Sequence, residues 1–392
     1  MRIPQTLADI SSLRGKVVLV RAGLNVPLDE SGNILDDFRI TKFLPTLQYL
    51  IDREAKVVVV AHIGRKKEDT LEPVAEYINK HIPLSFHKNF FTNDADIQNK
   101  CAYLQSELSE AGYGAVHLLD NIRQTDLEKA NDDNLATLLA GIADIYVNEA
   151  FSVSHRKHTS MVGIAKHADV SVTGLLCHEE VEQLSFAMSV NKNAVAVIGG
   201  NKFDTKLPLI SNFLETYQTV VVAGALANTL YHLAGYEVGT SVYEKDLSEA
   251  VVESLQKVIA HEHTYLPAVV IAQDVEGVKT VKHIEEVNKK DSIVDIAPEG
   301  LVDLETAVAQ ADFIVWNGPL GYYEAGHSDG TNRMLELIAG NSHANSLVGG
   351  GNTVDAVRDA NRESDVSFLS TGGGAMIDFL THGTLPAFEV LD

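Results

Sequence analysis

Short apolar runs alternate with longer amphipathic stretches along the whole chain. Runs rich in valine and isoleucine are typical of strands that are buried on both faces of a parallel sheet. Most intervals between them are long enough for a helix, so the pattern predicts an α/β protein with parallel sheets. The predicted strands are Val17–Val20, Val57–Ala61, Ala115–Leu119, Ile145–Asn148, Val195–Ile198, Thr219–Ala223, Ala268–Ala272, Ile293–Ile296, Phe313–Trp316, Ser346–Val348 and Ser367–Leu369.

The chain has 392 residues, which is more than one compact core usually holds and predicts two domains of similar size. The stretch from Leu175 onward is predicted to be a helix that joins the two halves, with the border near Ser185. No linker rich in Pro, Gly or Ser interrupts this region, so a helical connection is favoured over a flexible tether.

Composition and charge narrow the classes of partner. A hydrophobic content of 45% and a net charge of −23 describe an acidic globular protein that repels phosphate polymers, which argues against nucleic acid and anionic membranes. The two cysteines, Cys101 and Cys177, give no metal-ligand spacing and suit a reducing cytoplasm. No signal-peptide pattern is visible, and no apolar run approaches the roughly 20 residues that span a bilayer.

Basic side chains follow the predicted strands of the first half. In α/β sheets ligands bind beyond the carboxyl ends of the strands, so these positions are the candidate site. A single arginine there is more often a solvated surface residue, but four near different strand ends predict a pocket for a small, multiply charged anion, which the guanidinium fork grips with two hydrogen bonds. The candidate residues are Asn25, Arg39, His62, Arg65, Arg123 and Arg156.

Glycines replace arginines at the strand ends of the second half. They lie at Gly199–Gly200, Gly224, Gly318, Gly349–Gly351 and Gly372–Gly374. Glycine lets backbone N–H groups approach a phosphate closely, although a tight strand-to-helix turn is the simpler reading of any one of them. Neither the G-x-G-x-x-G fingerprint nor a P-loop is present at these turns.

Two lysines and one glutamate add to this second candidate site. Lys202 and Lys206 are four residues apart, so in a helix beginning near Gly200 both ammonium groups would lie on one face, beside free N–H groups. Such a site suits a nucleotide phosphate chain, while two solvated lysines are the alternative. Glu324 could accept hydrogen bonds from ribose hydroxyls or simply begin a helix. Together the two halves suit an enzyme of phosphoryl transfer.

An ordered series of motifs resembles the phosphoglycerate kinases over nearly the whole chain. The motifs are VLVRAGLNVPL, DDFRI, AHIGR, LLDNIR, YVNEAFSVSHRKHTSMVGI, VIGGNKFDTK, VWNGPLGYYE, VGGGNT and STGGGA. The resemblance implies two Rossmann-like domains that face each other across a hinged cleft. It also implies a monomer without nucleic-acid or membrane partners.

The resemblance further assigns ligands to the two domains. Residues 1–184, to which 375–392 return, would bind 3-phosphoglycerate or 1,3-bisphosphoglycerate, and residues 185–374 would bind ATP or ADP with Mg²⁺. The implied substrate residues are Gly23, Asn25, Arg39, His62, Arg65, Arg123 and Arg156. The implied nucleotide residues are Lys202, Lys206, Glu324, Gly350, Gly351, Asn352 and Thr353. The implied catalytic groups are Arg39, Lys202, Gly373 and Gly374.

Two departures from the family pattern matter for function. Gly23 stands where the family has an aspartate, and Asn352 replaces the aspartate that serves the nucleotide's magnesium, leaving a neutral oxygen for a hard cation. Because the series of motifs is otherwise complete, the leading hypothesis is an active phosphoglycerate kinase. The alternative is a weakly active or non-catalytic paralogue that binds phosphorylated ligands. A nicotinamide oxidoreductase lacks its glycine fingerprint here.

Overall fold

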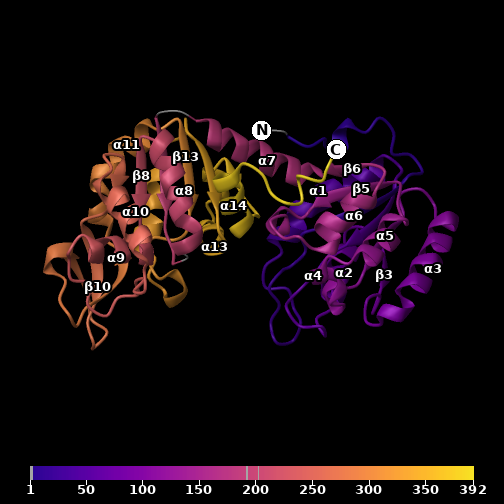
Figure 1. The fold of residues 1–392 in the computed structure, drawn as a ribbon, viewed down its shortest axis with the longest axis horizontal. Coiled ribbons are helices and arrows are strands. Elements are labelled where there is room, and N and C mark those ends of the chain that lie inside the picture. The colour runs from indigo at the N-terminus through magenta and orange to yellow at the C-terminus, as the bar shows by residue number, and fades with distance from the viewer. Residues whose placement is uncertain (1–2, 191–192, 202) are drawn as a thin grey trace. The chain divides into compact units, whose positions relative to one another are not determined.

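The computed structural model describes residues 3–190, 193–201 and 203–392, which form two compact units (Figure 1). The first unit comprises Met1–Glu182 and Thr384–Asp392, and the second comprises Gln183–Gly383. The two units divide between Glu182 and Gln183, inside helix α7 (Leu175–Ser189). The sequence predicted a helix from Leu175 onward, with the border near Ser185. The segment 375–392, expected to return to the first unit as a whole, is divided, because α14 (Gly374–His382) packs against α8 (Phe203–Thr216) within the second unit.

The first unit is built on a six-stranded parallel sheet with the strand order β3-β4-β2-β1-β5-β6. Its strands are β1 (Val17–Ala22), β2 (Lys56–Val60), β3 (Ser85–His87), β4 (Val116–Leu119), β5 (Ile145–Glu149) and β6 (Ser171–Thr173). Its helices, before α7, are α1 (Phe38–Asp52), α2 (Glu72–Asn79), α3 (Ile97–Glu110), α4 (Leu127–Ala130), α5 (Asp133–Ala140) and α6 (Ile164–His167). The short strands β3 and β6 escaped the sequence prediction because neither is a continuous apolar run.

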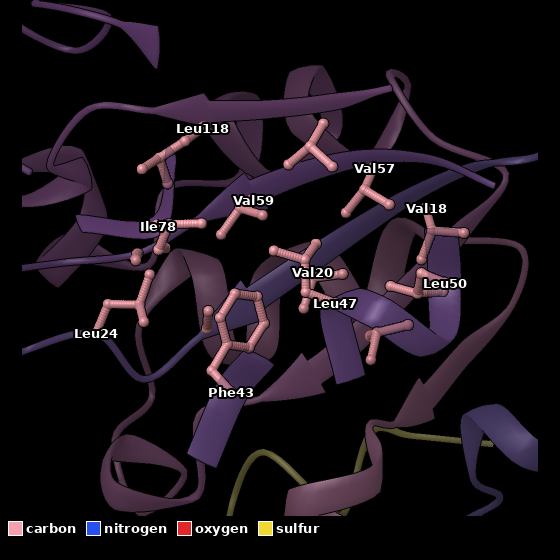
Figure 2. Packing of buried hydrophobic residues seen from close by; sticks show 14 of the residues in the cluster. Val18, Val20, Leu24, Phe43, Leu47, Leu50, Val57, Val59, Ile78 and Leu118 are labelled. Carbon is pink, nitrogen blue, oxygen red and sulfur yellow. The ribbon is translucent and has the colours of Figure 1, made fainter. Parts of the chain in front are cut away.

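The core of the first unit lies between the sheet and its helices, and Figure 2 shows one part of it. Val18 and Val20 of β1 and Val57 and Val59 of β2 are almost fully buried there. They pack in one cluster with Phe43, Leu47 and Leu50 of α1, Ile78 of α2 and Leu118 of β4. Burying each such side chain contributes about 1.5–3 kcal/mol, which explains why these strands are nearly continuous apolar runs.

The second unit contains another six-stranded parallel sheet, with the order β15-β14-β13-β7-β8-β9. Its strands are β7 (Ala194–Ile198), β8 (Thr219–Val222), β9 (Thr264–Tyr265), β13 (Phe313–Asn317), β14 (Asn345–Gly349) and β15 (Phe368–Leu369). The further helices of this unit are α9 (Gly224–Leu233), α10 (Glu249–Ala260), α11 (Glu305–Gln310), α12 (Asp329–Ala339) and α13 (Gly351–Asp359). The predicted α/β class with parallel sheets is confirmed for both large sheets.

Two predicted parallel strands prove to be antiparallel. The runs Ala268–Ala272 and Ile293–Ile296 form β10 (Val269–Gln273) and β12 (Ser292–Ile296), which pair antiparallel in a separate three-stranded sheet with β11 (Lys279–His283). The chain between β10 and β12 holds only β11 and one short 3₁₀ turn, so it lacks the helical crossover that a parallel pair requires. Strand β11 is largely exposed, which explains why no apolar run marked it.

Within the residues that the structure describes, no helix combines the length and the apolar character needed to cross a membrane.

Candidate active site

The basic residues predicted in the first half converge on one hollow of the first unit. The hollow has a volume of about 1020 Å³ and lies where the loops after several strands of the sheet meet. Its walls include six of the residues predicted from the sequence, namely Asn25, Arg39, His62, Arg65, Arg123 and Arg156. The segments that follow β1, β2, β4 and β5, and the first turn of α1, supply them, so positions far apart in the sequence form one cationic surface.

Two buried polar residues directly after β4 hold the loops of this hollow. The carboxylate of Asp120 accepts hydrogen bonds from the backbone N–H groups of Leu71 and Asn89, both at 2.9 Å. The amide of Asn121 accepts from the N–H of Arg123 and donates to the carbonyl of Ile63. The loops after β2, β3 and β4 are therefore tied to one another, and the motif LLDNIR, chosen only for its arginine, also carries these supporting residues.

Gly64 shapes the loop that follows β2. Its φ of +63° is in the left-handed region, and a Cβ there would lie 1.9 Å from Oδ2 of Asp69. The N–H of Gly64 donates to Oδ1 of Asn25 at 2.8 Å, and its carbonyl accepts from Nη1 of Arg123 at 2.9 Å. Glycine suits this position, because another side chain would strain the backbone and displace the carboxylate of Asp69, and its backbone orients two of the predicted ligand residues.

A buried arginine fixes the protonation of His62. Nη2 of Arg21 lies 2.9 Å from Nδ1 of His62, and because arginine only donates, Nδ1 must be the acceptor. Burial, together with the charges of Arg21, Arg123 and Arg39, holds the pKa of His62 well below its ordinary value. The ring is therefore neutral near pH 7 with its proton on Nε2, which makes His62 a hydrogen-bond donor within the cationic hollow.

The charge of Arg21 is balanced inside the protein. Its Nε donates to Oγ of Ser160 at 2.7 Å, and that hydroxyl donates to Oε1 of Glu128 at 2.6 Å. Burial opposes ionisation of Glu128, but hydrogen bonds from His158 and Ser160 and the charge of Arg21 lower its pKa below the ordinary value. Arg21 and Glu128 are thus buried opposite charges linked through the hydroxyl of Ser160, and this link holds Arg21 beside His62.

The remaining arginines leave a net positive field in the hollow. Burial and the charges of Arg156 and Arg21 lower the pKa of Arg123 to about 10, so its guanidinium still carries its charge near pH 7. Nη1 of Arg39 donates to Oγ of Ser152 at 3.0 Å. Like charges gathered at this density favour a multiply charged anion as the ligand.

The structure separates one predicted residue from this set and adds others. Gly23 is not among the described residues that line the hollow; a Cβ at this position would lie 3.5 Å from Cα of Ala150 and 3.7 Å from Oγ of Ser152, in ordinary contact. Lys129 and Ser152 line the hollow although the sequence did not single them out. Lys129 lies in the short helix α4, for which no apolar run gave a signal, whereas Ser152 lies inside the quoted motif YVNEAFSVSHRKHTSMVGI.

Glycines of the second unit allow three loops at the carboxyl ends of its strands to cross closely. A Cβ on Gly199, after β7, would lie 2.1 Å from the carbonyl oxygen of Pro319, and one on Gly224 would lie 2.7 Å from the backbone nitrogen of Gly200. By contrast, a Cβ on Gly351, Gly373 or Gly374 would meet nothing within 4 Å in the described part of the chain. The first group serves packing, and the second leaves open space at the starts of two helices.

Three helices begin at this edge of the second sheet without a side-chain cap. Helices α9, α13 and α14 follow strands β8, β14 and β15, and their N-cap residues are Ala223, Gly350 and Gly373. None of these caps has a side chain that accepts a hydrogen bond from the first turn. In α9 the N–H groups of Gly224 and Leu226 already donate to the carbonyls of Leu320 and Gly200. The starts of α13 and α14, with the positive ends of their helix dipoles, therefore suit an anion such as phosphate better.

Of the two predicted lysines, the structure describes only Lys206. Lys202 lies outside the described residues. Lys206 in α8 is buried, and its Nζ donates to the carbonyl oxygens of Gly199 and, at 3.4 Å, Asn317. Its ammonium group therefore lies where β7 and β13 end, inside the glycine-rich loops.

Two further predicted residues are brought together at the start of α13. Nδ2 of Asn352 donates to Oε1 of Glu324 at 2.9 Å. Oγ1 of Thr353 accepts from the N–H of Gly318 at 2.8 Å and ties this helix start to the loop after β13. The amide nitrogen of Asn352 thus contacts Glu324, and Oδ1 is the atom of this side chain that could bind a cation. A carboxylate at residue 352 could not donate to Glu324, so the two negative charges would repel each other.

A cationic hollow on one parallel α/β unit and uncapped helix starts on another are typical of phosphotransferases, which work by positioning and neutralising phosphates. The comparisons with known proteins agree with this class. A sequence model of the family Phosphoglycerate kinase matches residues 7–383.

Curated relatives and solved structures match over nearly the full length. Phosphoglycerate kinase of Helicobacter pylori is 38% identical over 386 residues, which cover 96% of this chain and 94% of that protein. The Helicobacter hepaticus enzyme is 36% identical and is covered to 98%. The structure of phosphoglycerate kinase from Coxiella burnetii superposes with a TM-score of 0.84 at 33% identity, covering 99% of this chain and 98% of that one. The chain belongs to the phosphoglycerate kinase family.

Proposed function

We propose that the protein catalyses reversible transfer of a phosphoryl group between the acyl phosphate of 1,3-bisphosphoglycerate and ADP, giving 3-phosphoglycerate and ATP. The observation that carries the proposal is the hollow of the first unit, in which residues from five separate motifs present cationic and neutral donors to one space. The acceptor in the reverse direction is then a carboxyl group. Family membership over residues 7–383 supports the same reaction.

The first unit is proposed to bind the glycerate. The fork-shaped guanidinium groups of Arg39, Arg65, Arg123 and Arg156 suit a carboxylate and a phosphate, and each charge-assisted hydrogen bond contributes about 1.5–3 kcal/mol. Neutral His62 adds an N–H donor without an acid group that could protonate the acyl phosphate. Oδ1 of Asn25 accepts from the N–H of Gly64, and its Nδ2 is the proposed donor to the substrate.

The second unit is proposed to bind the nucleotide. The uncapped starts of α13 and α14, with the open space at Gly351, Gly373 and Gly374, suit its phosphate groups. Lys202, Lys206, Gly350 and Thr353 complete this proposed set, and Glu324 is the candidate for the ribose. Mg²⁺ would arrive as part of the nucleotide substrate, held mainly by phosphate oxygens, with the neutral Oδ1 of Asn352 as the protein ligand.

The transfer step needs no proton from the protein. In the direction of ATP synthesis, an oxygen of the β-phosphate of ADP attacks the acyl phosphorus, and the bond from phosphorus to the carboxyl oxygen breaks, leaving 3-phosphoglycerate as a carboxylate. Arg39, Lys202 and the backbone N–H groups at Gly373 and Gly374 are the proposed stabilisers of the charge on the moving group. The mechanism requires both bound substrates to meet during turnover, with water excluded.

The proposal is tested by a coupled assay that follows NADH oxidation at several Mg²⁺ concentrations. Arg65→Ala removes an exposed guanidinium of the hollow, and we expect the KM for 3-phosphoglycerate to rise about 10–100-fold while that for ATP changes little. The matched control is Arg53→Ala, whose guanidinium lies 3.5 Å over the ring of Tyr49 and away from the hollow. Absence of turnover by the pure wild-type protein would refute the proposal.

A weakly active, ligand-binding paralogue is the second candidate, and the Asn352–Glu324 hydrogen bond is the observation that favours it. Asn352→Asp would place two carboxylates side by side, so we expect this variant to lose about 1 kcal/mol or less of stability without Mg²⁺ and to recover it when Mg-nucleotide binds. A large gain in turnover would mean that the native amide limits metal handling. Asn352→Ala, which removes the hydrogen bond without adding charge, is the control.

We further propose that the protein acts as a monomer in the cytoplasm. All residues proposed for each substrate come from one chain, and both cysteines are free thiols, which suits a reducing compartment. Sedimentation at micromolar concentration tests the oligomeric state.

A further inference from the structure

A cluster of three metal-ligating side chains lies in the first unit, outside the hollow. It consists of His87 on β3, His117 on β4 and Glu107 on α3, and none of the three is among the residues that line the hollow. One ligand atom from each residue lies within 4.8 Å of the other two. We propose that these three side chains form a binding site for a divalent transition-metal ion such as Zn²⁺.

The sheet brings the two histidines to the same face. Strands β3 and β4 are parallel, and Ser85 pairs with His117. Because side chains alternate between faces, His87, two residues after Ser85, shares the face of His117. Nε2 of His87 and Nδ1 of His117 are 3.0 Å apart and share a hydrogen bond, so both nitrogens are within reach of one ion that would replace this bond.

Glu107 supplies a carboxylate that the protein itself does not satisfy. Its Oε2 is buried and has no hydrogen-bond partner among the described residues, although Nδ1 of His87 lies 3.9 Å away. A buried carboxylate oxygen without a donor is costly, and a bound cation would remove that cost. Its flexible side chain can shorten the distances within the cluster to those of metal ligands.

The chemistry of the donors selects the class of metal. Two imidazoles and one carboxylate suit Zn²⁺ and its neighbours, whereas Mg²⁺ prefers an all-oxygen shell. All three donors lie on the first unit, on two neighbouring strands and one helix, so one ion can bind all of them. Binding an ion breaks the hydrogen bond between the rings: the donating histidine changes tautomer, and both rings rotate until their lone pairs point to the ion.

Access and room for a further ligand are also present. The side chains of His87 and Glu107 are 17% and 35% exposed, which leaves the cluster open to an ion from solvent. Three protein ligands leave the fourth position of a tetrahedral Zn²⁺ to water. The ion would join the edge strand β3 to β4 and α3, and its first effect would be on the stability of this unit.

The experiment uses the full chain without a histidine tag. Calorimetric titration with Zn²⁺ should show one saturable site per chain, and saturation should raise the melting temperature by about 5 °C. His117→Gln and the milder, half-buried Glu107→Gln should each weaken binding at least about tenfold. If His117→Gln fails to fold, Glu107→Gln, checked by circular dichroism, gives the answer alone.

His261→Gln is the matched control, because the rings of His261 and His263 have the same 5.2 Å separation as those of His87 and His117 but belong to no described three-ligand cluster. This variant should bind Zn²⁺ as the wild type does. Absence of a saturable site, or unchanged affinity in Glu107→Gln and His117→Gln, would overturn the proposal. Kinase turnover of Glu107→Gln without Zn²⁺ should equal that of the wild type, so this result is independent of the proposed function.

Discussion

His62 shows how a single residue can serve an anion site without carrying a charge. Arg21 occupies its Nδ1 atom, and burial among arginines keeps the ring neutral. A protonated imidazole would add one more positive charge to a hollow that already gathers several. The neutral tautomer instead provides a directed N–H donor at little electrostatic cost.

This arrangement makes the stability of the protein depend on pH. The pKa of His62 is lowered on folding, so below its ordinary value of about 6.5 the unfolded chain binds a proton that the folded chain does not, and stability falls as the pH drops. The variant His62→Asn keeps an acceptor for Arg21 in its Oδ1 but cannot bind this proton. We expect the free energy of unfolding of the variant to fall less steeply with decreasing pH, by up to about 1.4 kcal/mol per pH unit. Urea unfolding between pH 5 and 7 measures it.

The same titrations repeated at pH 8 provide the control, because there His62 is neutral in both states and its contribution to the slope vanishes. An identical acid slope in wild type and variant would show that His62 does not account for the acid sensitivity.

Side chains that end up in the hollow were predictable because arginine directly after an apolar run is conspicuous in an acidic chain. Asp120 and Asn121 were not, since their role depends on which loops the sheet order brings to them. Asn352 was flagged as a lost carboxylate, but its hydrogen bond to Glu324 required the fold, because 28 residues separate the two in sequence.

At the scale of elements, the turn between β2 and α2 depends on one glycine. Gly64 combines a positive φ with a space that Asp69 already fills. Gly64→Ala should therefore cost about 1–3 kcal/mol from the backbone conformation and more from the clash, and it should weaken 3-phosphoglycerate binding through Asn25 and Arg123. Chemical denaturation and the KM for 3-phosphoglycerate measure the two effects.

Gly32 is the matched comparison for this prediction. It also lines the hollow and has a φ of +83°, but a Cβ there would meet nothing within 4 Å in the described structure. Gly32→Ala should show the conformational cost alone. If both variants lose the same stability, the contact with Asp69 is not what excludes a side chain at residue 64.

Element type followed from sequence more readily than strand direction. Continuous valine runs identified both central sheets, because strands buried on two faces need apolar side chains at every position. Strands β10 and β12 were expected in a parallel sheet but pair antiparallel, because the exposed strand β11 between them gave no apolar signal.

At the scale of the whole molecule, the chain completes its first unit with its last residues. Leu385, Ala387, Phe388 and Leu391 in Thr384–Asp392 are buried, and the ring of Phe388 stacks on Phe151 at 5.9 Å. The backbone of Asp392 bonds to Gln5 and Ser171. The second unit, in contrast, is continuous in sequence.

Phe388→Ala should therefore destabilise the first unit by about 3–5 kcal/mol. Circular dichroism follows the secondary structure of both units, while the single tryptophan, Trp316, is buried in the second unit and reports on it alone. We expect the unfolding of the first unit, followed by circular dichroism, to shift to lower denaturant concentration. The unfolding of the second unit, followed by the fluorescence of Trp316, should keep its midpoint.

Glu389→Ala, next to Phe388 and exposed, is the control and should change neither transition. An unchanged dichroism midpoint in Phe388→Ala would mean that the closing segment contributes little to the first unit.

This split layout has a consequence during synthesis on the ribosome. Residues 1–182 emerge first, yet the surface around Phe151 stays uncovered until residues 384–392 have left the exit tunnel. The whole of the second unit is therefore synthesised before the first unit can bury this surface, and the nascent first half stays partly open to chaperones during that time.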